Sequence, residues 1–286
     1  MHIARIANHL IPPYLLFSRT YAIPSISKLL NETSQFETVC GKRYDDTSLL
    51  LEEMNNNPLT SERSIEALQR LNAIHNMYSN RISNDDMLYV LSVFILEPKK
   101  WIDKYEWRTL SGEEYQAIFI HWKGIGERMG IRDIPDTVSE FDDWSEAYEE
   151  KYMKYAKSNT LVGDATIGLF LSIAPTFMHS FGKQAAYCLM DTRLRAAMGY
   201  PSEIISATIL EFTLRLRKVC IRYLCLPRII SNQRVPFGSG EARSLCPMMP
   251  RHHVYEKTYK NGYLTANLGT APAGKLMKGE RPKYAG

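Results

Sequence analysis

Apolar residues recur at helical spacing over most of the first 225 positions, and the alternation typical of strands is nearly absent. A clear amphipathic stretch runs from about Ser61 to Ser79. Its apolar positions lie three or four residues apart, so the pattern predicts a helix with one buried face. The members of this stripe are Ile65, Leu68, Leu71, Ile74 and Tyr78.

The segment from Asp85 to Leu96 is apolar around nearly its whole circumference, which predicts the central, fully buried helix of the fold. The preceding Ser83 has the capping pattern of a helix start, and we expect Pro98 to break the helix. A second capping box at Ser111-Gly112-Glu113-Glu114 opens another amphipathic helix.

Further helices are expected at 24–30, at 44–54 and around Phe141 to Tyr155. Three more are predicted at 161–174, 176–198 and 202–225, ended by prolines and by Gly199. Residues 227–286 have no sustained period. The pattern therefore predicts an all-α fold: one domain over 1–286 of about eight helices, with an irregular lead-in at 1–20 and an extended basic tail.

Composition narrows the class of protein. Of the 286 residues, 45% are hydrophobic and 23% are charged, which is ordinary for a globular chain. The five cysteines show no CxxC or CxxH spacing, which argues against a disulfide framework and a zinc site. The net charge of +4 is too mild for a dedicated nucleic-acid binder.

Charge and hydropathy leave a peripheral membrane contact open. From Pro227 to the end, ten Lys and Arg face three Asp and Glu, so this tail either contacts an anionic lipid surface or is simply solvated. The longest apolar run, Ala165 to Met178, has 14 residues and contains Pro175. It falls short of the ~18 residues that a transmembrane helix needs, so we expect no such segment in this chain.

His75 lies on the apolar face of the predicted 61–79 helix, which allows two interpretations. One is a core imidazole hydrogen-bonded by a neighbour, and spacing alone favours it. The other is an axial haem ligand, for which Arg70 and Arg43 would supply cations for the propionates.

Two further patterns carry candidate chemistry. Arg43 and Thr47 are one helical turn apart and share a face, although Asp45 and Asp46 beside them are also typical of a helix N-terminus. The D-D-x-x-E spacing at 142–146 could hold Mg²⁺ and a diphosphate, and is otherwise a solvated acidic face.

Several ordered strings carry a family resemblance. The segments Arg70–His75 and Ile82–Phe94, extended by Tyr21–Leu30, Tyr105–Arg108 and Gly126–Ile131, resemble the fungal ER-bound oxygenases of mycophenolic-acid-type pathways. The similarity covers roughly residues 20–155 well. The wider family includes the bacterial latex-clearing rubber oxygenases.

The resemblance implies a globin-like fold that binds haem b, with His75 as the proximal ligand of the iron. Arg43 and Thr47 match the Arg and Thr of the distal segment of the rubber oxygenases. Asp46 stands where those enzymes have an iron-ligating Lys, which implies a sixth position open to water or O₂. By this resemblance Arg43, Asp46 and Thr47 are the expected catalytic residues, and Arg70 and Arg43 contact the cofactor.

The activity implied is addition of O₂ to a C=C bond of a terpenoid or prenylated substrate, with oxidative cleavage, at the endoplasmic reticulum membrane. Two other functions stay open. One is a haem-free terpenoid cyclase or pericyclase on the same fold, and the other is a non-catalytic protein that binds a membrane surface.

Overall fold

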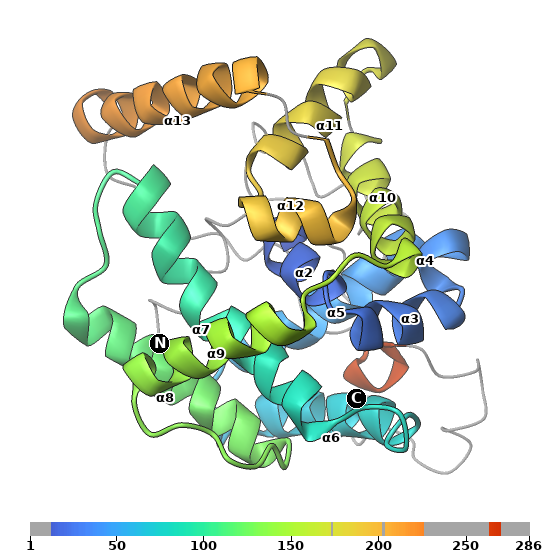
Figure 1. Cartoon of the computed structure of the whole chain (residues 1–286). Helices are drawn as coiled ribbons and strands as arrows, with labels where there is room; N and C mark the ends of the chain where they lie inside the picture. The colour runs from blue at the N-terminus through green and yellow to red at the C-terminus, as the bar shows by residue number, and fades with distance from the viewer. Residues whose placement is uncertain (1–12, 173, 202–203, 226–262, 270–286) are drawn as a thin grey trace. The chain divides into compact units, whose positions relative to one another are not determined.

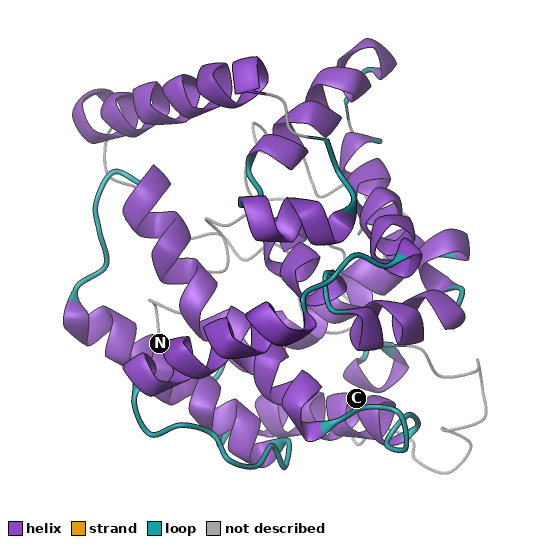
Figure 2. Cartoon of the chain, viewed as in Figure 1, coloured by secondary structure: helices purple, strands orange, loops and turns teal. Residues whose placement is uncertain are grey.

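The computed structural model describes residues 13–172, 174–201, 204–225 and 263–269, and over these residues it contains helices and no strand (Figures 1 and 2). The predicted all-α class is confirmed. The described residues divide into two compact units: residues 1–40 with 80–226, and residues 41–79 with 227–286. The prediction of a single domain over 1–286 stays a prediction.

The first unit opens with three short helices. They are α2 (Pro13–Tyr21), α3 (Pro24–Glu32) and α4 (Gln35–Thr38). Pro24 occupies the first turn of α3, as predicted, where its missing N–H costs no helical hydrogen bond.

The longer helices of this unit follow residue 80. They are α7 (Asn84–Tyr105), α8 (Gly112–Arg128), α9 (Val138–Tyr152), α10 (Lys157–Leu171), α11 (His179–Cys188), α12 (Thr192–Met198) and α13 (Ile204–Leu224), with a 3₁₀ turn η1 (Thr176–Met178) before α11.

Helix α7 forms the centre of the first unit and packs against α2, α8, α9 and α13. Its side chains are buried on nearly every side, as the apolar pattern predicted. Aromatic stacking joins it to its neighbours: Phe94 stacks on Trp122 of α8 with ring centroids 4.4 Å apart, and Tyr89 on Tyr148 of α9 at 5.0 Å.

The expectation that Pro98 ends this helix is wrong, because α7 continues to Tyr105. A proline inside a helix leaves the carbonyl four residues earlier, here that of Phe94, without its helical N–H donor. The residues on both sides of Pro98 are buried, including Leu96, Ile102 and Tyr105. Burial of these side chains offsets the lost hydrogen bond, so the packed environment overrides the local signal.

Caps fix the starts of α7 and α8 as predicted. The Ser83 hydroxyl accepts from the N–H of Asp86 at 3.0 Å. Ser111 and Glu114 form a reciprocal capping box at the start of α8. The predicted 176–198 helix is instead divided into η1, α11 and α12, since Asp191 accepts from the N–H of Leu194 and caps a new helix.

A partly buried ion cluster joins four elements of the first unit. Arg19 of α2 pairs with Glu97 of α7, Glu149 of α9 and Asp191 before α12. The hydroxyl of Tyr89 donates to Glu149 at 2.9 Å. Three carboxylates around one guanidinium raise the pKa of Arg19 despite its burial, so this side chain stays charged.

The second unit contains α5 (Cys40–Asn56), α6 (Glu62–Asn76) and a 3₁₀ turn, η2 (Thr265–Asn267). Helix α5 extends a few residues beyond its predicted bounds at both ends, and α6 is a few residues shorter than predicted. Most of the predicted basic tail, 226–262 and 270–286, lies outside the described residues. None of the helices that the structure describes is long and apolar enough to cross a bilayer.

Candidate functional site

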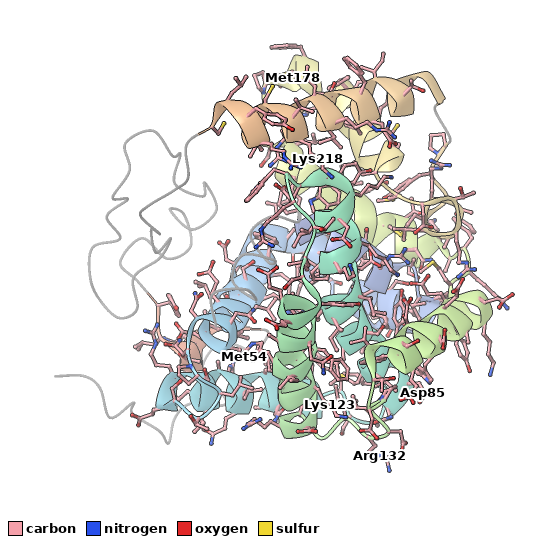
Figure 3. All side chains as sticks on the ribbon, turned by 90° about the vertical axis from the view of Figure 1, so that its left-hand side faces the viewer. Met54, Asp85, Lys123, Arg132, Met178 and Lys218 are labelled. Carbon is pink, nitrogen blue, oxygen red and sulfur yellow. The ribbon has the colours of Figure 1, made fainter. Side chains whose placement is uncertain are left out.

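The candidate site is built on α5 and α6, which are joined by residues 57–61 and tied together by the buried Glu53. Its carboxylate accepts from Arg63 Nε at 2.8 Å and from Asn57 Nδ2 at 3.1 Å. The Ser64 hydroxyl donates to the Glu53 carbonyl oxygen at 3.1 Å. Figure 3 labels Met54, the fully buried neighbour of Glu53 on α5. The turn between the helices is therefore fixed, and their far ends carry the residues that sequence analysis selected.

A short segment from Tyr263 to Gly269 packs on the second helix of this pair. The Tyr263 hydroxyl donates to Glu53, and the Leu268 carbonyl accepts from Arg70 Nε at 2.6 Å. Gly269 has φ +88°, and a Cβ at this position would collide with the side chain of Ile74. The segment thus contacts α5 through Glu53 and α6 through Arg70 and Ile74, and Ile74 directly precedes His75 in sequence.

His75 lies in the last turn of α6 and is half-buried. Its Nδ1 is buried and has no hydrogen-bond partner among the described residues. Burial, together with the positive charge of Arg43, lowers the pKa of His75 to about 4. The imidazole is therefore neutral at pH 7, with one buried nitrogen that no described neighbour satisfies.

This environment differs from that of a core histidine held by a neighbouring hydrogen bond, which spacing alone favoured. An unsatisfied buried polar atom costs about 1–3 kcal/mol, so such atoms call for a partner. The hydroxyl of Thr265 on η2 is likewise buried without a hydrogen-bond partner among the described residues. The second unit therefore has two polar atoms that a bound group could satisfy.

Arg43 and Thr47 do share a face of α5. Arg43 Nη1 donates to Thr47 Oγ1 at 3.3 Å, and the same hydroxyl donates to the Arg43 carbonyl at 2.9 Å. Since the charge of Arg43 acts on His75, the structure brings the start of α5 and the end of α6 into one electrostatic environment.

The interpretation of Asp45 and Asp46 as helix N-terminus residues is wrong. Helix α5 begins at Cys40, so both residues lie in its second turn, and both side chains are buried. Asp46 accepts from Lys42 Nζ at 2.6 Å. A buried carboxylate one turn into a helix is costly unless it is paired, so its position needs the cation beside it.

Arg70 is buried on α6 and has a partner that the sequence did not indicate, the Leu268 carbonyl. Burial lowers the pKa of Arg70, and the nearby Asp46 opposes this shift. The side chain thus fastens the 263–269 segment to α6 as well as contributing positive charge beside Asp46.

The predicted stripe of α6 is correct in part. Leu68 and Ile74 are buried, but Ile65 is exposed, since the buried face is rotated toward Ser64, Ala67 and Arg70. Glu53 was not predicted as a site residue, although it falls seven residues after Asp46 and therefore on the same face of α5. No sequence signal pointed to the contacts of Tyr263 or Leu268.

The D-D-x-x-E pattern is in the first unit, on the outer face of α9. Asp142, Asp143 and Glu146 are all exposed, and Asp142 pairs with Lys100 at 3.5 Å. Over the described part of the chain, no group of three or more His, Cys, Asp or Glu could hold a metal ion. The exposure of these carboxylates fits the solvated acidic face.

Comparison with known proteins decides the family. Residues 19–217 match the family described as "ER-bound oxygenase mpaB/B'/Rubber oxygenase, catalytic domain". The chain belongs to this family. The match includes α5 and α6 and every selected site residue from Arg43 to His75.

Three fungal relatives are similar to this oxygenase-family chain. It is 38% identical over 228 residues to the ER-bound oxygenase mpaB' of Penicillium brevicompactum, covering 73% of this chain and 54% of that protein. It is 38% identical over 198 residues to ER-bound oxygenase mpaB of Penicillium roqueforti (strain FM164), covering 64% of this chain and 66% of that protein.

The third relative, ER-bound oxygenase mpaB of Penicillium brevicompactum, is 34% identical over 226 residues, which cover 73% of this chain and 52% of that protein. The family member described here therefore spans about half to two thirds of the length of these relatives.

Proposed function

We propose that this chain is a haem b-dependent oxygenase in which His75 binds the iron and the substrate is a terpenoid or prenylated compound with a C=C bond. The observation that carries the proposal is the buried, unsatisfied Nδ1 of a neutral His75. The names of the relatives, all oxygenases, support the reaction class.

The residues present fit the proposed cofactor. Metal ions bind neutral imidazole, and the lowered pKa of His75 keeps the ring neutral over the physiological range. A group bound at the ring nitrogen that lacks a partner would remove the free-energy cost of leaving this atom buried and unsatisfied. Arg43, whose charge already acts on His75, is the proposed contact for a propionate.

Haem, when bound, would supply the O₂ chemistry, and the chain would hold the ring and shape access to it. In this proposal Thr47, held by Arg43, offers a hydroxyl next to the cation. Asp46 opposes the lowering of the pKa of Arg70 by burial, and Arg70 holds the 263–269 segment on α6. An apolar isoprenoid chain would bind mainly through burial of its surface. We also propose that the chain acts at the endoplasmic reticulum membrane, as the relatives' names suggest.

The decisive experiment is the absorbance spectrum of the purified protein after reconstitution with hemin. We expect a Soret band near ~400–420 nm and about one haem for each chain, as histidine ligation gives. His75→Ala should lose the band. The matched control is His121→Ala, because His121 is also half-buried and its pKa is also lowered, but it lies on α8 in the first unit.

A protein that binds no hemin, or a His75→Ala variant that keeps the wild-type spectrum, would contradict the cofactor assignment. Product formation from a polyene without O₂ would favour the haem-free cyclase instead. Incorporation of ¹⁸O from labelled O₂ into a carbonyl product would support the oxygenase.

A further inference from the structure

Helix α13 has an unusual distribution of apolar residues for a helix on the surface of a domain. Its half-buried residues Leu210, Leu214 and Ile221 lie on one side. The opposite side, which a surface helix normally fills with polar residues, is apolar as well. Its members recur at spacings of three and four residues and are each more than half exposed: Ile209, Phe212, Leu216, Val219 and Tyr223.

The inner side of α13 is fixed by polar contacts to the end of α7. Lys218 Nζ donates to the Asp103 carbonyl at 3.1 Å, and Arg217 pairs with Glu106 at 3.1 Å. Figure 3 shows Lys218 on the side of α13 that faces α7. The exposed apolar stripe therefore faces away from the unit.

A second group of exposed apolar side chains belongs to the element beside α13. Helix α11 packs against α13, and Phe177, Met178 and Phe181 of η1 and α11 are all exposed. Figure 3 shows Met178 at the outer edge of the unit, beyond α13 and opposite Lys218. We call the eight residues of the two groups the α11–α13 apolar face. Single exposed apolar residues are ordinary, but eight of them on two elements that pack against each other mark an interaction surface.

Charge identifies the partner. Residues 208–225 contain four basic side chains and one acidic side chain, a net charge of +3. Arg215 and Arg222 are exposed along one flank of the stripe, and Glu211, the acidic residue, is already paired with Arg215 at 2.9 Å. Apolar residues on one face with cations at its edge are the pattern of a helix that lies in the surface of an anionic bilayer.

We propose that the α11–α13 apolar face binds the surface of an anionic lipid bilayer, with the apolar stripe inserted among the lipid chains and Arg215 and Arg222 at the headgroups. A second copy of the chain fits less well, because a self-complementary contact would bring two basic flanks together with no unpaired acid from this stretch to meet them. The inference gives a surface for the membrane location proposed above, and it does not depend on haem or on His75, which belongs to the other unit.

The test is flotation of the full chain with vesicles of phosphatidylcholine, alone or with about one third phosphatidylserine. We expect wild type to float with the anionic vesicles. The double variant Phe212→Ser with Leu216→Ser should bind at least tenfold more weakly, because both lost side chains would be buried in lipid. Ile120→Ser is the matched control, since Ile120 is 61% exposed on α8 and Phe212 is 67% exposed.

The contribution of the two arginines to lipid binding can be tested independently of the apolar residues. Arg215→Gln and Arg222→Gln should each weaken binding to the anionic vesicles about fivefold, and should leave binding to neutral vesicles unchanged. Circular dichroism and thermal unfolding check that each variant is folded, and the exposure of the substituted residues makes this the expected result.

Three results would overturn the proposal. They are a wild-type chain that does not float, a Phe212/Leu216 variant that floats as well as wild type, and a wild-type dimer in light scattering that this variant converts to monomer. The last result would assign the face to a second copy of the chain.

Discussion

The imidazole of His75 differs from an ordinary buried polar side chain because one of its ring nitrogens has no hydrogen-bond partner among the described residues. This atom, Nδ1, is out of contact with solvent, while burial and Arg43 lower the pKa of the ring to about 4. Its position on an apolar face could be predicted from spacing, but the missing partner could not. That depends on which groups other elements bring to the end of α6, and a one-dimensional pattern does not contain this information.

The pKa of His75 predicts a pH dependence of stability. Without haem, the unfolded chain takes up the proton near pH 6.5, and the folded chain does so only near pH 4. Stability from this group is therefore complete above pH 6.5 and falls as the pH drops through that window, by about 2 kcal/mol between pH 7 and pH 5.

The measurement is urea unfolding of the haem-free protein at these two pH values. His75→Gln should lose about 2 kcal/mol less than wild type over the same interval, since other titrating groups are common to both proteins. Equal losses in the two proteins would show that the ring titrates normally in the folded state.

The ends of a helix could be predicted where the local sequence signals and the tertiary packing of that helix favour the same residue. The start of α8 was correct because Ser111 and Glu114 cap it within four residues. The end of α7 was not, because the burial of residues beyond Pro98 depends on α8, α9 and α13. The buried acids of α5 were also misassigned, because the helix begins at Cys40, five residues before the N-terminal signal that Asp45 and Asp46 resemble.

Glu53 offers a test of how α5, α6 and the 263–269 segment are joined. Glu53→Gln would weaken its contacts with Arg63, Asn57 and Tyr263 and leave the guanidinium without its carboxylate. We expect a loss of roughly 3 kcal/mol in unfolding free energy and faster amide hydrogen exchange at 263–269. The control Glu62→Gln, at an exposed position of α6, should stay within about 0.5 kcal/mol of wild type. Unchanged exchange at 263–269 in Glu53→Gln would refute this role.

On the scale of the whole molecule, the fold class was predictable because helical periodicity repeats along the chain. The division into two units was not, since it rests on contacts between residues far apart in sequence. In the first unit, Arg19 makes such contacts. It joins α2 to Glu97, Glu149 and Asp191, which follow it in the sequence by 78, 130 and 172 positions.

Removing the Arg19 charge should therefore destabilise the first unit as a whole. We expect Arg19→Gln to cost roughly 3–5 kcal/mol at pH 7, because three carboxylates lose their shared cation. Arg193→Gln is the control, since Arg193 is more exposed and lies 3.7 Å from Glu149. Thermal unfolding of both variants at pH 7 checks this, and an Arg19→Gln cost no larger than that of Arg193→Gln would argue against this role of Arg19.

The hydrogen bond from Tyr263 to Glu53 spans 210 positions of the chain. During synthesis on the ribosome, Glu53 therefore has no hydrogen bond from Tyr263 until nearly the whole polypeptide has been made. At usual elongation rates Tyr263 follows Glu53 by about 10–40 s. Before the end of that interval the last residue of the first unit has been synthesised, so this unit can fold while the second is still missing a segment. The segment that contacts Arg70 and Ile74, close to His75 on α6, is therefore added to the second unit last.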